Sequence, residues 1–172
     1  MTGTATTHTT TAATALADQL SSSVPKLDSS GKNWAIFLIH FQDAVEAKGF
    51  WGHFDGTEPC PQPDVKDQAT ADENPAVKQW RRDEMSAKSL LSQKLPDSTL
   101  LRIRMKKSVK ERWDEVVTEF TEKGTYAQTE LRAKFLDSRC TEKGNVHEFL
   151  EGLRTKRKEL ATMGVDIKER DY

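Results

Sequence analysis

The sequence of 172 residues predicts an all-α protein, and three observations support this fold class. Large apolar residues recur at intervals of three and four, which is the period of an amphipathic helix. Asn or Ser, followed three residues later by Glu, precedes two of these stripes and is typical of a helix start. No run of alternating apolar and polar residues indicates a strand.

The composition predicts a reduced, cytoplasmic chain that makes no membrane contact. Hydrophobic residues make up 35% and charged residues 31%, with a net charge of −1, so overall charge favours no class of partner. Cys60 and Cys140 belong to no CxxC or Cys/His cluster, which argues against a disulfide framework and a zinc site. The sequence contains neither a secretory leader nor an apolar run long enough to span a bilayer.

Residues 1–23 are mostly Thr, Ser and Ala, and we predict a disordered arm because such a segment cannot bury enough surface to offset its ordering entropy. Residues 33–49 form the first predicted helix, with Asn33 as its cap and Gly49 at its end. Its apolar stripe consists of Trp34, Phe37, Leu38, Phe41 and Val45. Residues 50–74 contain Pro59, Pro61, Pro63, Gly52 and Gly56, and we predict a long, partly mobile loop there.

The next helix is predicted from Asn74, its cap, and Pro75, its first residue, to Leu95, because Pro96 stops it. Its apolar face consists of Val77, Trp80, Ala87 and Leu91. A short helix capped by Asp97 follows. Ser108 and Glu111 then have capping-box spacing, and Val109, Trp113, Val116, Val117 and Phe120 supply the inner face of the helix they begin.

Gly124 is predicted to end that helix, and Thr125 to begin another one that contains Leu131 and Phe135. A last helix is predicted from Asn145, with Glu148 three residues on, to Gly164. Its stripe consists of Val146, Phe149, Leu150, Leu153 and Leu160. Six aromatic residues are the predicted core anchors of the whole protein: Trp34, Phe37, Phe41, Trp51, Trp80 and Trp113.

No catalytic, metal or cofactor motif is present in the sequence, and we predict neither an enzyme nor a small-molecule ligand. Gly31-Lys32 lacks the upstream glycine of a phosphate-binding loop. His53 lies in a Trp-rich turn and could act as a ligand or a base, but a structural role is favoured because no partner residues at suitable spacing accompany it.

Two basic clusters could contact RNA phosphates without reading sequence. They consist of Arg102, Arg104, Lys106, Lys107, Lys110 and Arg112, and of Arg154, Lys156, Arg157 and Lys158. The alternative is a solvated helix face, since Glu111, Asp114, Glu115, Glu151 and Glu159 lie close in sequence. We favour this alternative because no aromatic residue interleaves the charges to provide a stacking platform.

Five motifs follow one another in an order that resembles a known family. They are Leu27 with Gly31-Lys32-Asn33-Trp34, then Gly49-Phe50-Trp51-Gly52-His53-Phe54-Asp55-Gly56 with the loop through Pro63, then Trp80 with Ala87 and Leu95, then Val109, Trp113 and Val116, and finally Gly144, Val146, Glu148 and Leu150. In this order they resemble the Gag polyprotein of copia-type LTR retrotransposons, over about residues 25–172. Trp34, Phe37 and Val109 replace the family's usual residues with other apolar ones, and the family's zinc knuckle is absent.

This resemblance implies a retroviral-capsid-like helical bundle with a complete N-terminal lobe, residues 24–122, and a truncated C-terminal lobe, residues 123–172. Because the second lobe would lack part of its cover, its apolar residues are predicted either to pack on the first lobe or to mediate self-association. These residues are Leu131, Phe135, Phe149, Leu150, Leu153 and Leu160.

Three functions stay open at this point, because a fold does not settle a function. The first is a capsid domain that self-assembles around RNA. The second is a non-specific RNA-binding module, and the third is a domesticated or decayed remnant that acts as an interaction adaptor.

Overall fold

The computed structural model describes residues 19–62, 74–165 and 167, and these residues contain six helices and no strand. They are α2 (Trp34–Glu46), α3 (Trp51–Asp55), α4 (Pro75–Ser92), α5 (Asp97–Ile103), α6 (Val109–Leu136) and α7 (Val146–Thr162). The all-α prediction is therefore confirmed. The segment 1–18 of the predicted arm and residues 63–73 of the predicted loop lie outside the described residues.

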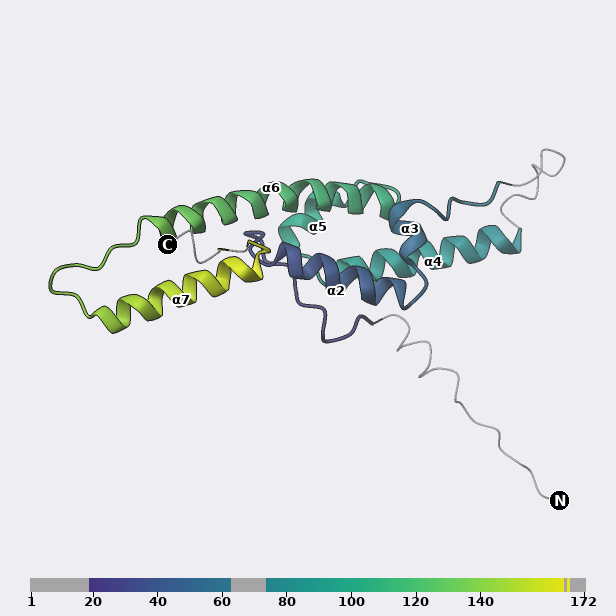
Figure 1. Ribbon diagram of the computed structural model, residues 1–172. Helices are drawn as coiled ribbons and strands as arrows, with labels where there is room; N and C mark the ends of the chain where they lie inside the picture. Colours follow the sequence, from purple (N-terminus) through teal and green to yellow (C-terminus); the bar gives the residue numbers. More distant parts are fainter. Residues whose placement is uncertain (1–18, 63–73, 166, 168–172) are drawn as a thin grey trace, which may run out of the picture.

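The helix α6 contributes to two cores, one along each of its halves (Figure 1). The first core lies where α2, α3, α4 and α5 pack on the N-terminal half of α6. The second is small: Phe135, Leu160 and Ile167 are its buried members, and α7 supplies its other side by folding back along the C-terminal half of α6.

Aromatic rings fill the centre of the first core. The indole of Trp113, on α6, lies 5.1 Å from the ring of Phe41, 5.7 Å from Phe54 and 5.8 Å from Trp51. Trp34 lies 6.1 Å away on its other side. Five of the six predicted anchors therefore belong to this core or pack against it.

Trp80, the sixth predicted anchor, differs. Its side chain is half-buried and lies outside this core, against His53. The reason is a charged residue on the same helix face: Glu84, one turn further along α4, is buried and keeps polar partners beside it.

The predicted helix break at Gly124 is wrong, because α6 continues through it to Leu136. A glycine inside a helix costs only about 1 kcal/mol relative to alanine, and here the backbone of a neighbouring turn packs on it. Gly31, with φ +78°, places its carbonyl oxygen 3.6 Å from the position of a Cβ at Gly124. The predicted lobe boundary near residue 122 thus falls inside one helix, and the division into lobes stays a prediction.

Several local predictions also need correction. Asn33 does not cap α2 with its side chain; instead it accepts the N–H of Asp28 and donates to the carbonyl of Lys26, which braces the preceding loop. Asp97 is the first residue of α5 rather than its cap, which is Pro96. The predicted loop contains the short helix α3, which ends at Gly56 with φ +85°.

The predicted arm ends earlier than residue 23. Leu20 and Val24 are buried in the first core, and the N–H of Leu20 donates to the side chain of Gln93. Lys94 extends this attachment, because its carbonyl accepts the N–H of Leu27 and its amine donates to the carbonyl of Val24. Sparse apolar residues in a polar segment can therefore dock when a helix end offers hydrogen-bond partners.

Other predicted caps are confirmed. The side chain of Asn74 accepts the N–H of Ala76 at the start of α4, with Pro75 as the first helical residue. Ser108 and Glu111 form the predicted capping box of α6. Asn145 caps α7, and Gly164 follows its end with φ +82°.

We predict that Gly31→Ala lowers the free energy of unfolding by about 2 kcal/mol, since an alanine would be strained at a positive φ. Its Cβ would also lie 2.8 Å from the Cβ of Lys123 and 3.0 Å from the nitrogen of Gly124. Gly152→Ala is the control, because a Cβ there meets open space within α7, and it should gain up to about 1 kcal/mol. Denaturant unfolding measures both, and equal stabilities of the two variants would contradict the close packing at Gly31.

We also predict a pH-dependent effect of Glu111→Gln. The backbone N–H groups of Ser108 and Lys107, with Lys106 and Lys107 nearby, hold the pKa of Glu111 below its ordinary value of 4.5. A lowered folded-state pKa means that the carboxylate's stabilisation is complete above pH 4.5 and is lost as the pH falls through the folded-state value. Unfolding measured across this range should show a difference from the parent protein that shrinks in acid, whereas Glu122→Gln on the same helix should show little difference throughout.

Candidate functional site

Within the described residues 19–62, 74–165 and 167, no three His, Cys, Asp or Glu side chains are arranged to hold a metal ion. No helix in the same part of the chain has the length and apolarity needed to cross a membrane. Four features remain to be considered as sites: a buried polar network, a pocket at the junction of helices, the basic clusters and the exposed apolar residues.

The buried polar network joins three helices. His53 on α3 and Glu84 on α4 are both buried, and the Nδ1 of His53 lies 3.0 Å from the Oε2 of Glu84. The other carboxylate oxygen of Glu84 accepts the N–H of Val109 at 2.7 Å and lies 3.1 Å from the Nζ of Lys88. A carboxylate at this position also interacts favourably with the positive N-terminal end of α6.

This arrangement supports a structural role for His53. Its Nε2 lies 3.8 Å from a carboxylate oxygen of Glu58, and the ring of Trp80 covers it at 5.2 Å. Glu84 was not predicted as a partner of His53. A signal was nevertheless present, because Glu84 interrupts the α4 stripe formed by Val77, Trp80, Ala87 and Leu91, and a charge on an apolar face needs a buried partner.

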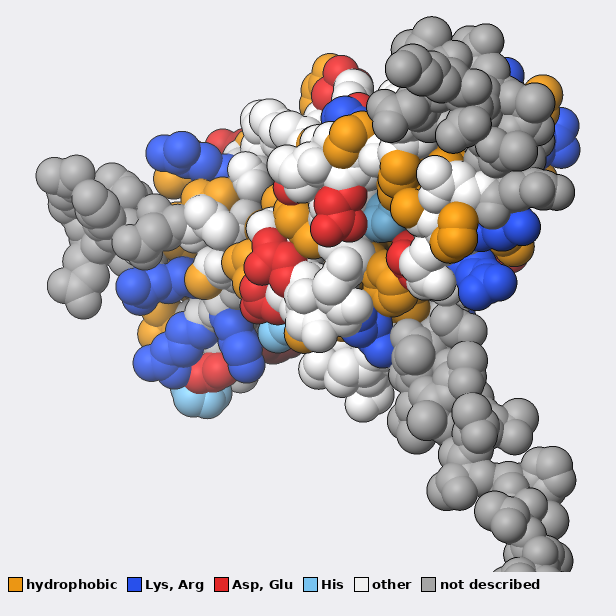
Figure 2. All heavy atoms as spheres, turned by 90° about the vertical axis from the view of Figure 1, so that its right-hand side faces the viewer, with side chains coloured by type: hydrophobic (Ala, Val, Ile, Leu, Met, Phe, Trp, Pro, Cys, Tyr) orange, Lys and Arg blue, Asp and Glu red, His pale blue; other side chains and the backbone are white. Residues whose placement is uncertain are grey.

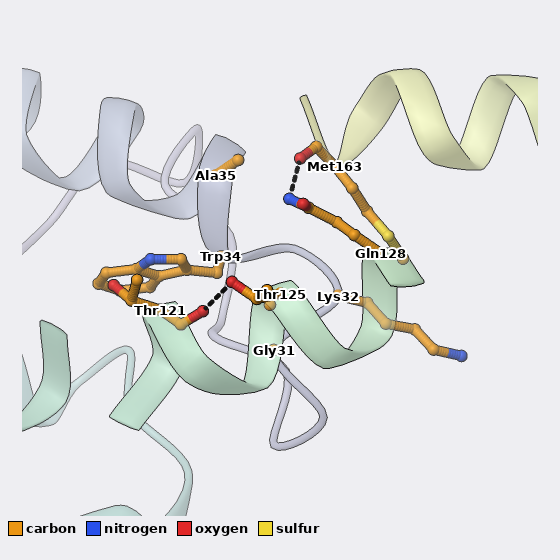
Figure 3. Close-up of a pocket in the computed structure, with 9 residues that line it drawn as sticks. Gly31, Lys32, Trp34, Ala35, Thr121, Thr125, Gln128 and Met163 are labelled. Atoms are coloured by element: carbon orange, nitrogen blue, oxygen red, sulfur yellow. Dashed lines mark hydrogen bonds between the residues drawn. The ribbon is translucent and has the colours of Figure 1, made fainter. Parts of the chain in front are cut away.

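The junction pocket lies where the start of α2, the middle of α6 and the end of α7 meet (Figure 3). Its volume is about 110 Å³, below the range of about 300–1,000 Å³ that small-molecule sites occupy. The Nε2 of Gln128 donates to the carbonyl of Met163 at 2.8 Å across it, and Lys32 points away from the Trp34 indole. The pocket therefore lies at the packing interface between the end of α7 and the first core.

The first basic cluster is largely neutralised by acidic residues of α6. Arg102 pairs with Glu119, Lys106 with Glu115 at 3.4 Å, and Lys110 with Asp114 at 2.9 Å. The Nε of Arg112 donates to the carbonyl of Lys106. Arg104 and Lys107 are exposed in the connection between α5 and α6. Lys106 lies in the same connection, although its amine pairs with Glu115 of α6.

The second basic cluster lies on α7. Arg154 pairs with Glu151. The amine of Lys156 donates to the carbonyl of Lys134, on the facing helix α6, and to the hydroxyl of Ser138, just after the end of that helix. Arg157 and Lys158 are exposed. On the end of the molecule seen in Figure 2, blue side chains lie in separate groups with red and white surface between them. No continuous basic patch covers that face.

The six residues predicted to mediate self-association fall into two groups. Phe135 and Leu160 are buried within the second core, and Leu131 and Leu153 pack against it. Phe149 is half-buried, and Leu150 is 45% exposed. Phe135 and Leu160 are therefore interior residues and are not available to a partner, because α6 and α7 cover one another.

Two exposed residues that were not predicted to mediate self-association lie beside this group. Leu136 is 55% exposed at the end of α6, and Val146 is 62% exposed at the start of α7. With Leu150 they form what we call the hairpin tip, at the end of the α6–α7 pair furthest from the first core (Figure 1). Val146 and Leu150 are one helical turn apart and share a face of α7.

Comparison with known proteins gives one positive finding. The family model of the gag-polypeptide of LTR copia-type matches residues 42–172. Neither the curated proteins nor the solved structures give a match to this chain. The family match spans α3 to α7 completely and begins within α2, so it includes the second core and the part of the first core that follows residue 42.

We predict that the buried polar network stabilises the folded protein. Glu84→Ala should lower the free energy of unfolding by about 3–5 kcal/mol, because it leaves the His53 ring, the Val109 N–H and the Lys88 amine without their acceptor. The same substitution at the exposed Glu151 is the control and should change stability by less than about 0.5 kcal/mol. If denaturant unfolding gave similar losses for the two variants, the network would not hold α3, α4 and α6 together.

Proposed function

The chain belongs to the gag-polypeptide family of LTR copia-type elements, and we propose that its helical domain self-assembles into a capsid that encloses the element's RNA in the cytoplasm. In this proposal the protein has an architectural role. The first core gives each copy a fixed shape, and contacts between copies build the shell. The family membership supports a structural Gag protein, and the assembly step is argued from the surface of the second core.

The exposed hairpin tip is the observation that carries the assembly proposal. Leu136, Val146 and Leu150 expose large apolar side chains beside a core that has only three buried members. The short pair of helices cannot cover these side chains itself, because its inner faces are already engaged with one another. A second copy of the chain presents the same apolar surface, and pairing two tips would remove both from water.

RNA enclosure is supported by a smaller set of residues than the sequence suggested. Arg104, Lys107 and Lys158 are exposed, whereas the side chains of Arg102, Lys106 and Lys110 pair with carboxylates. We therefore propose weak, salt-sensitive RNA contacts from each copy, which become strong when many copies line one shell.

We predict that the double variant Val146→Lys with Leu150→Lys abolishes growth of large assemblies, because charged residues would oppose one another across paired tips. Ile39→Lys is the matched control, since Ile39 is 56% exposed on α2, away from the hairpin tip, and it should assemble like the parent protein. Light scattering as a function of protein concentration, with and without RNA at low and moderate salt, measures the mass of the particles.

The outcomes of this experiment separate the open functions. Assembly of the double variant at the parent's concentration would place the contacts elsewhere. A parent protein that stays monomeric and indifferent to RNA would contradict assembly and favour an interaction adaptor.

A further inference from the structure

A groove of about 380 Å³ lies between α4 and the segment that leads into α6. The helix α4 contributes Trp80, Arg81, Glu84, Met85 and Lys88, and the segment before α6 contributes Lys107 and Ser108. Trp80 and Met85 supply its large apolar side chains, and Met85 is 71% exposed. The groove therefore combines an aromatic ring, an apolar neighbour and three cationic side chains.

The indole of Trp80 is held in one orientation. Its Nε1–H donates to the carbonyl of Glu58 at 2.8 Å, and the ring of His53 lies against it with 5.2 Å between ring centroids. Because its only donor is engaged, the indole offers carbon surface to the groove rather than a hydrogen bond. A fixed, half-buried aromatic ring of this kind suits stacking of a planar group.

The acidic residue in the groove does not oppose an anion strongly. The carboxylate of Glu84 is buried and is shared among the Val109 N–H, the His53 ring and the Lys88 amine. The carboxylate of Glu111, in the first turn of α6, accepts the backbone N–H groups of Lys107 and Ser108. The exposed amine of Lys107 therefore brings positive charge to the groove from the segment that faces α4.

We propose that this groove binds one unpaired nucleotide of a single-stranded RNA, with its base on the Trp80 indole and its phosphate against Lys107. Stacking on a ring without a free donor accepts any base, so binding would be insensitive to sequence. Trp80 and Lys107 are distant in sequence, and the fold places both in this groove. Lys107 is an exposed member of a basic cluster that contains no aromatic residue.

This inference rests on the proposed function only in taking RNA as the partner, and the test separates the two. Full-length protein is titrated into fluorescently labelled, unstructured RNA oligomers of one base type, and anisotropy measures affinity at several salt concentrations. Lys107→Ala is compared with Lys143→Ala, which removes the same charge from an exposed position in the turn before α7. Trp80→Leu is compared with Trp80→Phe, which keeps an aromatic ring.

We expect Lys107→Ala to weaken RNA binding several-fold and to lower the salt slope by about one, whereas Lys143→Ala leaves both near the parent values. Trp80→Leu should weaken binding by at least about five-fold, and Trp80→Phe should recover part of that loss. Circular dichroism checks that each variant is folded. If Trp80→Leu does not fold, the comparison of Lys107→Ala with Lys143→Ala tests the proposal.

Equal affinities of Lys107→Ala and Lys143→Ala for RNA would overturn the groove as an RNA site, as would a parent protein that binds no RNA. In either case light scattering still reports whether the chain assembles, so the proposed function stands or falls separately. If a polyglutamate peptide, tested in the same assay, depended on Trp80 and Lys107 while RNA binding did not, the groove would belong to an acidic protein partner and the proposal would be wrong.

Discussion

Contact between Trp113 and the aromatic rings of α2 and α3 is the interaction on which the other features depend. The indole of Trp113 fixes the short helix α3 through Trp51 and Phe54, each less than 6 Å away between ring centroids. A helix of five residues has no stability of its own, because helix nucleation is costly. Once α3 is placed, His53 meets Glu84, and Glu84 in turn meets the first N–H groups of α6, the helix that carries Trp113. The aromatic core and the polar network therefore stabilise the same set of helices from two sides.

The sequence predicted most of this fold because apolar period and capping are local properties. The capping box at Ser108 and the Asn74–Pro75 start are set by residues within one turn, so they could be read without the rest of the chain. Gly124 and Asn33 were misjudged for the opposite reason. Whether a glycine ends a helix, or whether an asparagine caps one, depended here on a loop that packs against it from elsewhere in the chain.

The surfaces were harder to predict than the helices. Spacing on α7 correctly grouped Leu150 with its neighbours but could not tell that Leu160 faces inward, because burial depends on the partner helix. Carboxylates on α6 neutralise much of the positive charge of the basic cluster of residues 102–112. The groove beside Trp80 is formed with a segment nearly thirty positions away in sequence. Pairing of this kind is a property of the tertiary fold, and no local pattern contains it.

Because α6 is one uninterrupted helix, it fixes the orientation of the hairpin tip relative to the first core. A helix of 28 residues is about 42 Å long, and each successive residue lies about 100° further around the helix axis. No loop within α6 can absorb a change in length between Phe120 of the first core and Phe135 of the second. Insertion or deletion of one residue there would swing the exposed leucines of the hairpin around the helix axis by more than a right angle. In the proposed shell, curvature would follow from the direction in which each subunit presents its contacts, so the length of this segment would help to set that curvature.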